Sequence, residues 1–288
     1  MKDLNYQLMN LCKANRDGSF STQATRRRIL DRIANQLHEL GYKHMQAKSL
    51  KPKHVEALVS LWKDQDLSVG TLKNLLSGLR WWARHVGKGD MIPKDNSAYD
   101  IGNRSQVATE SKAWELKEEQ LARVSDEYVR LSLRLQAAFG LRREEAIKFR
   151  PNYAIKDDHI KLKASWTKGG RVRTVPIRTD EQRRLLDDVR KLARGGALIP
   201  ANKNYVDQKI RYDSQVRTAA IKNPHGLRHA YAQQRYEELT GWKAPVAGGP
   251  ASNSLSSNQR ALDKGARETI SRELGHSRES VSANYLGL

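Results

Sequence analysis

Residues 274–287 read LGHSRESVSANYLG and place His276 nine positions before Tyr285. On one uninterrupted helix, nine steps of about 100° would leave the two side chains on opposite faces. Gly275 offers a break, because glycine readily ends a helix and a new short helix can start after it. We therefore predict a helix that ends at Leu274, His276 in the turn, and a short final helix that presents Tyr285 back toward the same site.

Two earlier segments add basic side chains to this pair. GLRREEA (140–146) carries Arg142 just after Gly140 and Leu141, where a helix can break, and HGLRH (225–229) carries Arg228. A phosphodiester under attack gains negative charge, and planar guanidinium groups neutralise such charge with two directed hydrogen bonds each. One arginine alone would mean little in a basic chain, because most arginines are surface residues. Together the segments supply the residue set needed to attack a phosphodiester without a metal.

HGLRH has a spacing that suits phosphate contact. His225 and Arg228 are three positions apart, which on a helix places both side chains on one face, and the adjacent His229 is expected to point elsewhere. The two histidines are also four apart, as in a metal pair. No glutamate follows His225 as in the zinc-protease motif, however, and no third ligand is evident. We therefore expect no metal at this pair of histidines.

The chain is strongly basic. Its 288 residues include 52 Lys and Arg against 32 Asp and Glu, which gives a formal net charge of +20. This excess favours nucleic acid as the partner, although charge alone leaves other basic proteins open. The single cysteine, Cys12, excludes an internal disulfide and is expected to pack in a core in a reducing compartment. No apolar run reaches the about 18 residues of a membrane span, and the N-terminus lacks the apolar core of a secretory signal.

Periodicity and turn residues predict two domains. Helices of the first are expected over residues 22–40, 52–63 and 72–86. Trp81 and Trp82 could form a base-stacking platform, but their place in an apolar stripe favours core packing. A polar, aperiodic stretch from about residue 93 marks a linker. We expect a first, helical domain over residues 1–108 and a second domain over residues 109–288.

The second domain is predicted to be mainly helical with a small sheet. Helices are expected over residues 117–124, 127–139, 179–192, 205–220, 226–239 and 265–274. Two alternating stretches, DHIKLKASW (158–166) and RVRTVPI (171–177), are joined by residues 167–170 and favour a β-hairpin. Residues 241–265 are rich in Gly, Pro, Ala and Ser, and we expect them to form a long surface loop inserted in the domain.

These motifs together resemble those of the tyrosine recombinase family, also called the phage integrases, over nearly the full chain. GLRREEA resembles the first arginine box, with Arg142 as its arginine and Glu145 as the supporting acid; HGLRHAYA resembles the second box and LGHSRESVSANY the third. The turn lysine of the family's hairpin falls on Lys168 in TKGGRVRTVPI, while the competing Lys161 and Lys163 are expected within a strand. The resemblance implies a helical core-binding domain and an α+β catalytic domain that form a C-shaped DNA clamp.

The resemblance also implies an activity. The chain would be a site-specific DNA recombinase or integrase that cleaves and rejoins strands through a covalent 3′-phosphotyrosine on Tyr285. Arg142 and Arg228 would stabilise the transition state. Tyr231 and Tyr236 are alternative nucleophiles, but both lie on the predicted arginine helix and are expected to pack in the core.

Three further side chains receive roles from the resemblance. Lys168 would protonate the departing 5′-oxygen, and His276 would hydrogen-bond a non-bridging phosphate oxygen. His225 would accept the tyrosine proton or assist as acid and base. A 5′-hydroxyl of a second strand would then reverse the attack, so that neither ATP nor a metal is required.

The implied partner is double-stranded DNA, bound by a homo-tetramer on two paired sites, with accessory DNA-bending or directionality proteins as further candidates. The expected location is the cytoplasm, with a bacterial or phage-encoded protein associated with the nucleoid. Only three residues follow Tyr285, whereas many family members continue into a further helix that docks on a neighbouring protomer. We expect the loop over residues 241–265 to make the subunit contact instead, or to touch DNA.

Two other functions stay open from the sequence. One is a type IB-like DNA topoisomerase that uses the same covalent intermediate, and the other is a DNA-binding regulator without cleavage activity. The helical N-terminal domain favours a recombinase over a topoisomerase, and the complete residue set disfavours the regulator.

Overall fold

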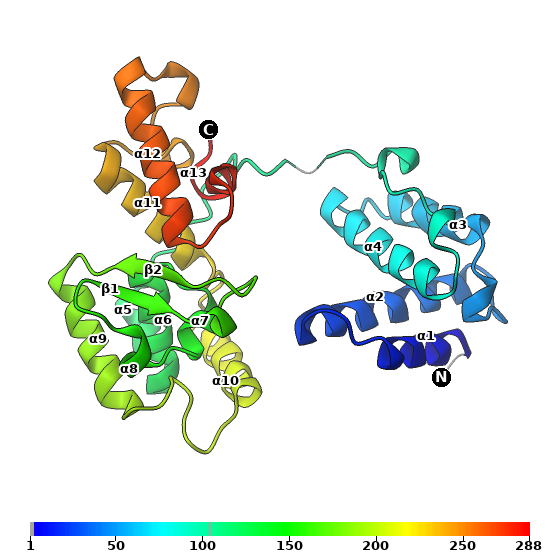
Figure 1. The fold of residues 1–288 in the computed structure, drawn as a ribbon, viewed down its shortest axis with the longest axis horizontal. Helices are drawn as coiled ribbons and strands as arrows, with labels where there is room; N and C mark the ends of the chain where they lie inside the picture. The colour runs from blue at the N-terminus through cyan, green and yellow to red at the C-terminus, as the bar shows by residue number, and fades with distance from the viewer. Residues whose placement is uncertain (1–2, 104) are drawn as a thin grey trace. The chain divides into compact units, whose positions relative to one another are not determined.

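The computed structural model describes residues 3–103 and 105–288 and divides the chain into two compact units. The first unit runs to Ser105 and the second begins at Gln106 (Figure 1). This division lies close to residue 108, where the sequence predicts the boundary. Within the described residues, no helix combines the length and the apolar character that crossing a membrane requires.

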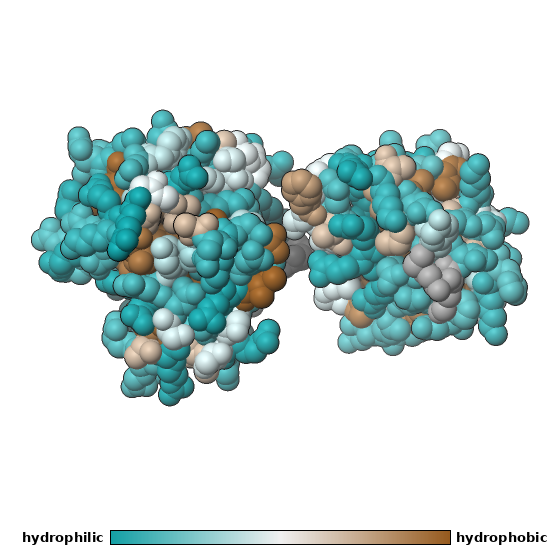
Figure 2. All heavy atoms as spheres, turned by 90° about the horizontal axis from the view of Figure 1, so that it is seen from below, coloured by the Kyte–Doolittle hydropathy of each residue, from teal (hydrophilic) through white to brown (hydrophobic). Residues whose placement is uncertain are grey.

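The surfaces of both units are mostly polar. Figure 2 shows hydrophilic side chains over most of the visible face of each unit, with hydrophobic residues only in small groups. Such a surface is typical of a domain that keeps its apolar residues in a core.

The described part of the first unit is built from helices and contains no strand. Its elements are α1 (Asp3–Ala14), α2 (Phe20–Glu39), η1 (Ala47–Ser49), α3 (Pro52–Asp64), α4 (Val69–His85), η2 (Gly89–Met91) and η3 (Ser97–Tyr99). Ser19 and Ser68 cap α2 and α4, because each hydroxyl accepts a hydrogen bond from a backbone amide of the first turn. These caps fix the starts of two of the helices that the sequence predicts.

The core of the first unit confirms the expected roles of three residues. Cys12 and Trp81 are buried, and Trp82 is fully buried, with its Nε1 donating to the Ala47 carbonyl at 3.0 Å. The tryptophan pair therefore packs in the core and does not form an exposed stacking platform.

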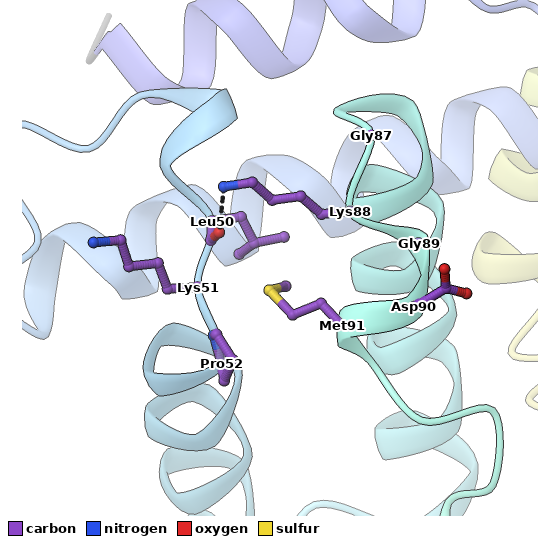
Figure 3. Close-up of a pocket in the computed structure, with 8 residues that line it drawn as sticks. All are labelled: Leu50, Lys51, Pro52, Gly87, Lys88, Gly89, Asp90 and Met91. Carbon is purple, nitrogen blue, oxygen red and sulfur yellow. Dashed lines mark hydrogen bonds between the residues drawn. The ribbon is translucent and has the colours of Figure 1, made fainter.

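A hollow of about 370 Å³ lies between the start of α3 and the turn η2. Figure 3 shows Lys88 reaching across it from the end of α4. The Lys88 ammonium donates to the carbonyls of Lys48, at 2.6 Å, and Leu50, at 2.9 Å. This contact ties the segment that leads into α3 to the segment that follows α4.

The second unit is mainly helical with one small sheet, as predicted. Its helices are α5 (Glu118–Ala122), α6 (Glu127–Phe139), α7 (Arg143–Ile147), α8 (Pro151–Ala154), α9 (Asp180–Ala193), α10 (Tyr205–Thr218), α11 (Gly226–Thr240), α12 (Ser257–Glu273) and α13 (Ala283–Leu286). Short 3-10 turns are η4 (Ala164–Trp166), η5 (Pro245–Ala247), η6 (Ser252–Ser254) and η7 (Glu279–Ser282). Helix α11 contacts α6, α12 and α13, so it links the elements that carry the site (Figure 1).

The predicted hairpin is present but has shorter strands. Strand β1 (His159–Leu162) pairs antiparallel with β2 (Arg173–Pro176), with Ile160 opposite Val175. The expected first strand ends early because the chain turns into η4, where Trp166 is buried against the core. The connection between the strands is therefore longer than the four residues expected.

The prediction of a long inserted surface loop over residues 241–265 is wrong for much of that range. Helix α12 begins at Ser257 and not at residue 265, because Ser256 and Gln259 form a capping box. Gly265 lies inside α12, where a glycine is tolerated at a cost, and it is not the start of the helix. The preceding segment is also packed, since Ala244 and Leu255 are buried.

Candidate active site

Arg228 is the centre of the candidate site. It projects from the first turn of α11 and is fully buried. Its Nη1 donates to the Gly140 carbonyl at 2.5 Å, and its Nη2 donates to the Leu274 carbonyl. Its Nε donates to the Tyr285 hydroxyl at 3.3 Å, and Nη2 lies 3.4 Å from His276 Nε2. One guanidinium thus joins the end of α6, the end of α12 and the final helix.

The environment keeps Arg228 charged. Burial, together with the neighbouring Arg173 guanidinium, lowers the pKa of Arg228 to about 10. Because this value lies well above neutral pH, the guanidinium carries its positive charge near pH 7. A buried cation of this kind can neutralise an anion that enters the site.

Gly140 gives Arg142 its position. Gly140 ends α6 with φ +60°, and a Cβ at this residue would lie 2.6 Å from the Tyr231 ring. Only glycine meets both requirements without strain. The chain therefore turns sharply after α6, and Arg142 becomes the N-cap of α7.

Glu145 holds Arg142 in place. Arg142 Nη1 donates to Glu145 Oε1 at 2.9 Å, and the Arg142 backbone amide donates to Oε2 at 2.7 Å. Burial alone would raise the pKa of the Glu145 carboxyl, but the guanidinium groups of Arg173, Arg228 and Arg142 lower it below its usual value. Glu145 is therefore an anion, while the Arg142 side chain keeps 20% of its surface exposed for contact with a ligand.

Tyr285 lies between imidazole rings. Its side chain is 6% exposed, and its ring centroid is 4.5 Å from that of His229 and 5.5 Å from that of His276. The prediction that His229 points away from the site is wrong. Helix α13 packs along the α11 face that carries His229 and Gln233, and Gln233 Nε2 donates to the Tyr285 carbonyl at 3.0 Å. His225 is the N-cap of α11, and its ring centroid lies 5.5 Å from that of His229.

All three histidines of the site have a lowered pKa. Burial, followed by the charges of Arg228 and Arg142, lowers the pKa of His225. Burial and nearby cations also lower the pKa of His229 to about 4 and that of His276 to about 3. All three rings are therefore neutral near pH 7, and each can donate one hydrogen bond and accept another. Across residues 3–103 and 105–288, no group of three or more metal-ligating side chains is arranged to hold a metal.

These pKa values predict a pH-dependent stability. Imidazole in an unfolded chain has a pKa near 6.5, so unfolding lets His229 and His276 take up protons between about pH 6.5 and pH 4. The stability that the two neutral histidines contribute is fully present above about pH 6.5 and is lost as the pH falls toward their folded-state pKa values. We expect the free energy of unfolding to fall by roughly 1–2 kcal/mol more between pH 7 and pH 5 in the wild type than in a His229→Gln/His276→Gln variant, after allowance for solvent screening. Urea unfolding of both proteins at pH 7 and pH 5 measures this difference. An equal fall in the free energy of unfolding in the two proteins would contradict the prediction.

Arg173 is a site residue that the sequence reasoning missed. It lies on β2, is buried, and donates to Glu145 Oε2 and to the Glu273 carbonyl. The signal was the strand alternation, because residue 173 falls on the same inward face as the buried Val175. A charged side chain on the inward face of a strand needs a buried partner.

Three lysines of the hairpin are candidates for the site. Lys168 is exposed in the connection between β1 and β2, where Gly169 and Gly170 adopt φ +83° and +65°. Within the described residues, the hydrogen bonds of Arg228 and Tyr285 go to other residues and not to Lys168. Lys161 lies in β1, and Lys163 follows β1 with its ammonium 6.0 Å from the Tyr153 ring.

The competing tyrosines are packing residues, as expected. The Tyr231 hydroxyl donates to Glu273 at 2.7 Å, and the Tyr236 hydroxyl donates to Asp263 at 2.6 Å. Both rings are buried, and burial together with the acceptor carboxylate raises the pKa of each phenol, that of Tyr236 to about 12. Each hydroxyl thus donates to a carboxylate.

Comparisons with known proteins place this site in context. A family model described as "Phage integrase, N-terminal" matches residues 1–92, and one described as "Integrase" matches residues 101–234. No curated protein matches the chain in sequence.

Several solved structures share the fold of the whole chain. The XerH site-specific recombinase bound to a palindromic difH substrate is 18% identical with a TM-score of 0.57, and the match covers 99% of this chain and 81% of that chain. A lambda integrase dimer bound to a COC′ core site is 15% identical with a TM-score of 0.63, covering 98% of this chain and 76% of that chain. The Tn1549 transposon integrase in complex with circular intermediate DNA is 15% identical with a TM-score of 0.56, covering 100% of this chain and 96% of that chain.

Proposed function

The chain belongs to the phage integrase family of tyrosine site-specific recombinases, and we propose that its second unit cleaves and rejoins DNA through a covalent phosphotyrosine formed at Tyr285. The observation that carries the proposal is the contact between Arg228 and the Tyr285 hydroxyl, at 3.3 Å, inside a cluster that also holds His276. A nucleophile and a cation that meet at one point can act on the same phosphate.

The two site arginines supply the charge that the transition state needs. The Arg142 side chain, paired with Glu145, stays partly exposed, and Arg228 Nε donates to the Tyr285 hydroxyl. The attacked phosphate gains negative charge, which the positive charges of these two guanidinium groups offset. When the Tyr285 oxygen attacks phosphorus, the bond from phosphorus to the 5′-oxygen breaks, and the energy of the ester is kept in the new bond to the protein.

Neutral imidazoles surround the phenol and can handle protons. His276 lies beside both Arg228 and the Tyr285 ring, and we propose that its ring donates to a non-bridging phosphate oxygen. The Tyr285 proton can be taken up by an imidazole that is unprotonated at neutral pH, and His225 is our candidate. The His225 ring lies 5.5 Å from that of His229, which in turn lies 4.5 Å from the Tyr285 ring. The reverse attack by a 5′-hydroxyl then regenerates free Tyr285.

Lys168 is proposed as the acid that protonates the 5′-oxygen, and this role gives a sharp prediction. We expect Lys168→Ala to slow cleavage of ordinary DNA by about 10²-fold or more, in the range of general acid catalysis. A substrate with sulfur in place of the bridging 5′-oxygen should be cleaved almost normally by the same variant, because a thiolate leaves without a proton. Matched Lys161→Ala and Lys163→Ala variants serve as controls. An equal defect of Lys168→Ala on both substrates would contradict the role.

Double-stranded DNA is the proposed partner of both units. The net charge of +20 supplies many phosphate contacts, so that binding should weaken steeply with salt. We propose that the helical first unit reads the site together with the second unit, and that four copies assemble on two paired sites. One of the similar solved structures is a lambda integrase tetramer bound to a Holliday junction, which supports this assembly. Accessory DNA-bending proteins would act on the same complex.

A selection from random DNA tests the function and finds the target sequence in one experiment. The protein is incubated with a library of nicked duplexes, and DNA that stays attached after denaturation is sequenced. A recombinase yields adducts on one enriched sequence, a topoisomerase yields adducts on nearly all sequences, and a binding-only regulator yields none. Enrichment of one palindrome-like site is the expected result.

A further inference from the structure

Arg173 is a buried cation that the proposed chemistry does not use. Its side chain is 4% exposed, and its guanidinium donates to two protein acceptors. Burying a charged group is expensive unless it is paired and hydrogen-bonded. Arg173 meets this condition through two partners that belong to different parts of the site, Glu145 and the Glu273 carbonyl.

The first contact acts on the end of α12. Arg173 Nη1 donates to the Glu273 carbonyl, and Arg228 Nη2 donates to the adjacent Leu274 carbonyl. Two arginines from different elements therefore satisfy consecutive carbonyls at one helix end, where helical partners are lacking. Gly275 follows with φ +69°, and a Cβ there would lie 2.6 Å from Arg173 Cδ. The Arg173 side chain thus fills the space beside the turn that leads to His276.

The second contact acts on the charge of Glu145. Glu145 Oε2 accepts from Arg173 and from the Arg142 amide, while Oε1 accepts from Arg142 Nη1 at 2.9 Å. Without Arg173, the buried carboxylate would hold the Arg142 guanidinium as its main counter-charge and draw it away from a phosphate. With Arg173 present, one of the three guanidinium charges offsets Glu145, and the charges of Arg142 and Arg228 remain for the ligand.

We propose that Arg173 is a positioning residue of the strand-cleavage site, which braces Glu145 against the end of α12 so that Arg142, Arg228 and His276 face one phosphate. The inference rests on the proposed function, because it concerns the rate of the same reaction. Arg173 acts through Glu145 and the α12 end, and it does not touch DNA.

The test separates the rate of cleavage from the affinity for DNA. We expect Arg173→Met to bind the site selected for the wild type within about twofold, while the maximal rate of covalent adduct formation at saturating protein falls by about 10- to 100-fold, as befits one lost electrostatic element. Arg173→Lys should recover part of that rate, because it restores the charge next to Glu145. Arg178→Met is the matched control, since Arg178 follows the same strand and pairs with Glu238 outside the cluster; it should cleave as the wild type does.

A double variant tests the inference even if Arg173→Met does not fold. Glu145→Gln/Arg173→Met removes both charges of the buried Glu145–Arg173 pair, so that neither is left without the other. We expect the defects of Glu145→Gln and Arg173→Met to be less than additive in the double variant, because the two residues act as one unit.

The possible outcomes distinguish a failure of this inference from a failure of the proposed function. If the wild type forms no adduct on any DNA, the proposed function fails and the inference fails with it. If the wild type forms adducts and folded Arg173→Met forms them at the same rate, only the inference is overturned. If Arg173→Met does not fold, wild-type rates in both Arg173→Lys and the double variant overturn it. A lower rate at unchanged affinity supports it.

Discussion

Replacing Tyr285 by phenylalanine is expected to lower covalent adduct formation by more than about 10³-fold, because the substitution removes the attacking oxygen. The change takes away one atom from a ring that is otherwise packed against His229, so the fold should be kept. Arg228 loses one acceptor but keeps the carbonyls of Gly140 and Leu274. DNA binding by Tyr285→Phe should therefore stay within about twofold of the wild type.

Denaturing gels measure the adduct, and a shift of labelled duplex measures the binding. Tyr231→Phe is the matched control, because Tyr231 is also buried and loses one hydroxyl contact, to Glu273. It should form the adduct at the wild-type rate with a stability cost of about 1 kcal/mol. Adduct formation by Tyr285→Phe, or an equal loss in Tyr231→Phe, would show that another residue is the nucleophile.

The sequence located the parts of the site that depend on local patterns. Gly275 does end the helix before His276, so the nine-residue spacing brings the histidine and Tyr285 to one place. Gly140 likewise ends α6 and leaves Arg142 at the start of α7. Each of these features is set by a glycine that adopts a positive φ next to the motif, and glycine positions are visible in a sequence.

The features that the sequence did not reveal depend on packing between distant segments. In the sequence, Arg173 looks like an ordinary hairpin residue. Only the folded chain brings it to Glu145 and to the end of α12. His229 becomes part of the site because α13 packs on its face of α11, which spacing within α11 cannot show. The start of α12 was missed for a local reason, since Gly265 was taken as its beginning and the capping box at Ser256 was overlooked.

Substitutions of Arg228 should separate its structural role from its chemical one. Arg228→Ala leaves the carbonyls of Gly140 and Leu274 buried without a donor, and each loss costs about 1–3 kcal/mol. We expect the free energy of unfolding of the second unit to fall by about 3–5 kcal/mol, since a cavity is also created. The adduct should be absent, but this variant alone cannot distinguish lost chemistry from lost structure.

Arg228→Lys resolves the two effects. A single ammonium keeps the charge, but it cannot reach both carbonyls and the Tyr285 hydroxyl at once, because it lacks the planar fork of a guanidinium. We expect the lysine variant to recover at least half of the stability lost in Arg228→Ala, while adduct formation stays about 10²-fold or more below the wild type. Urea unfolding and single-turnover cleavage measure the two quantities.

Arg130→Lys is the control for the Arg228 variants, because Arg130 also binds a backbone carbonyl through two nitrogens, that of Val124, away from the site. It should cleave as the wild type does, since the loss of a forked contact there changes only local packing. An Arg228→Lys variant that cleaves at the wild-type rate would mean that charge alone suffices, and the directed contact between Arg228 and Tyr285 would then have no part in the reaction.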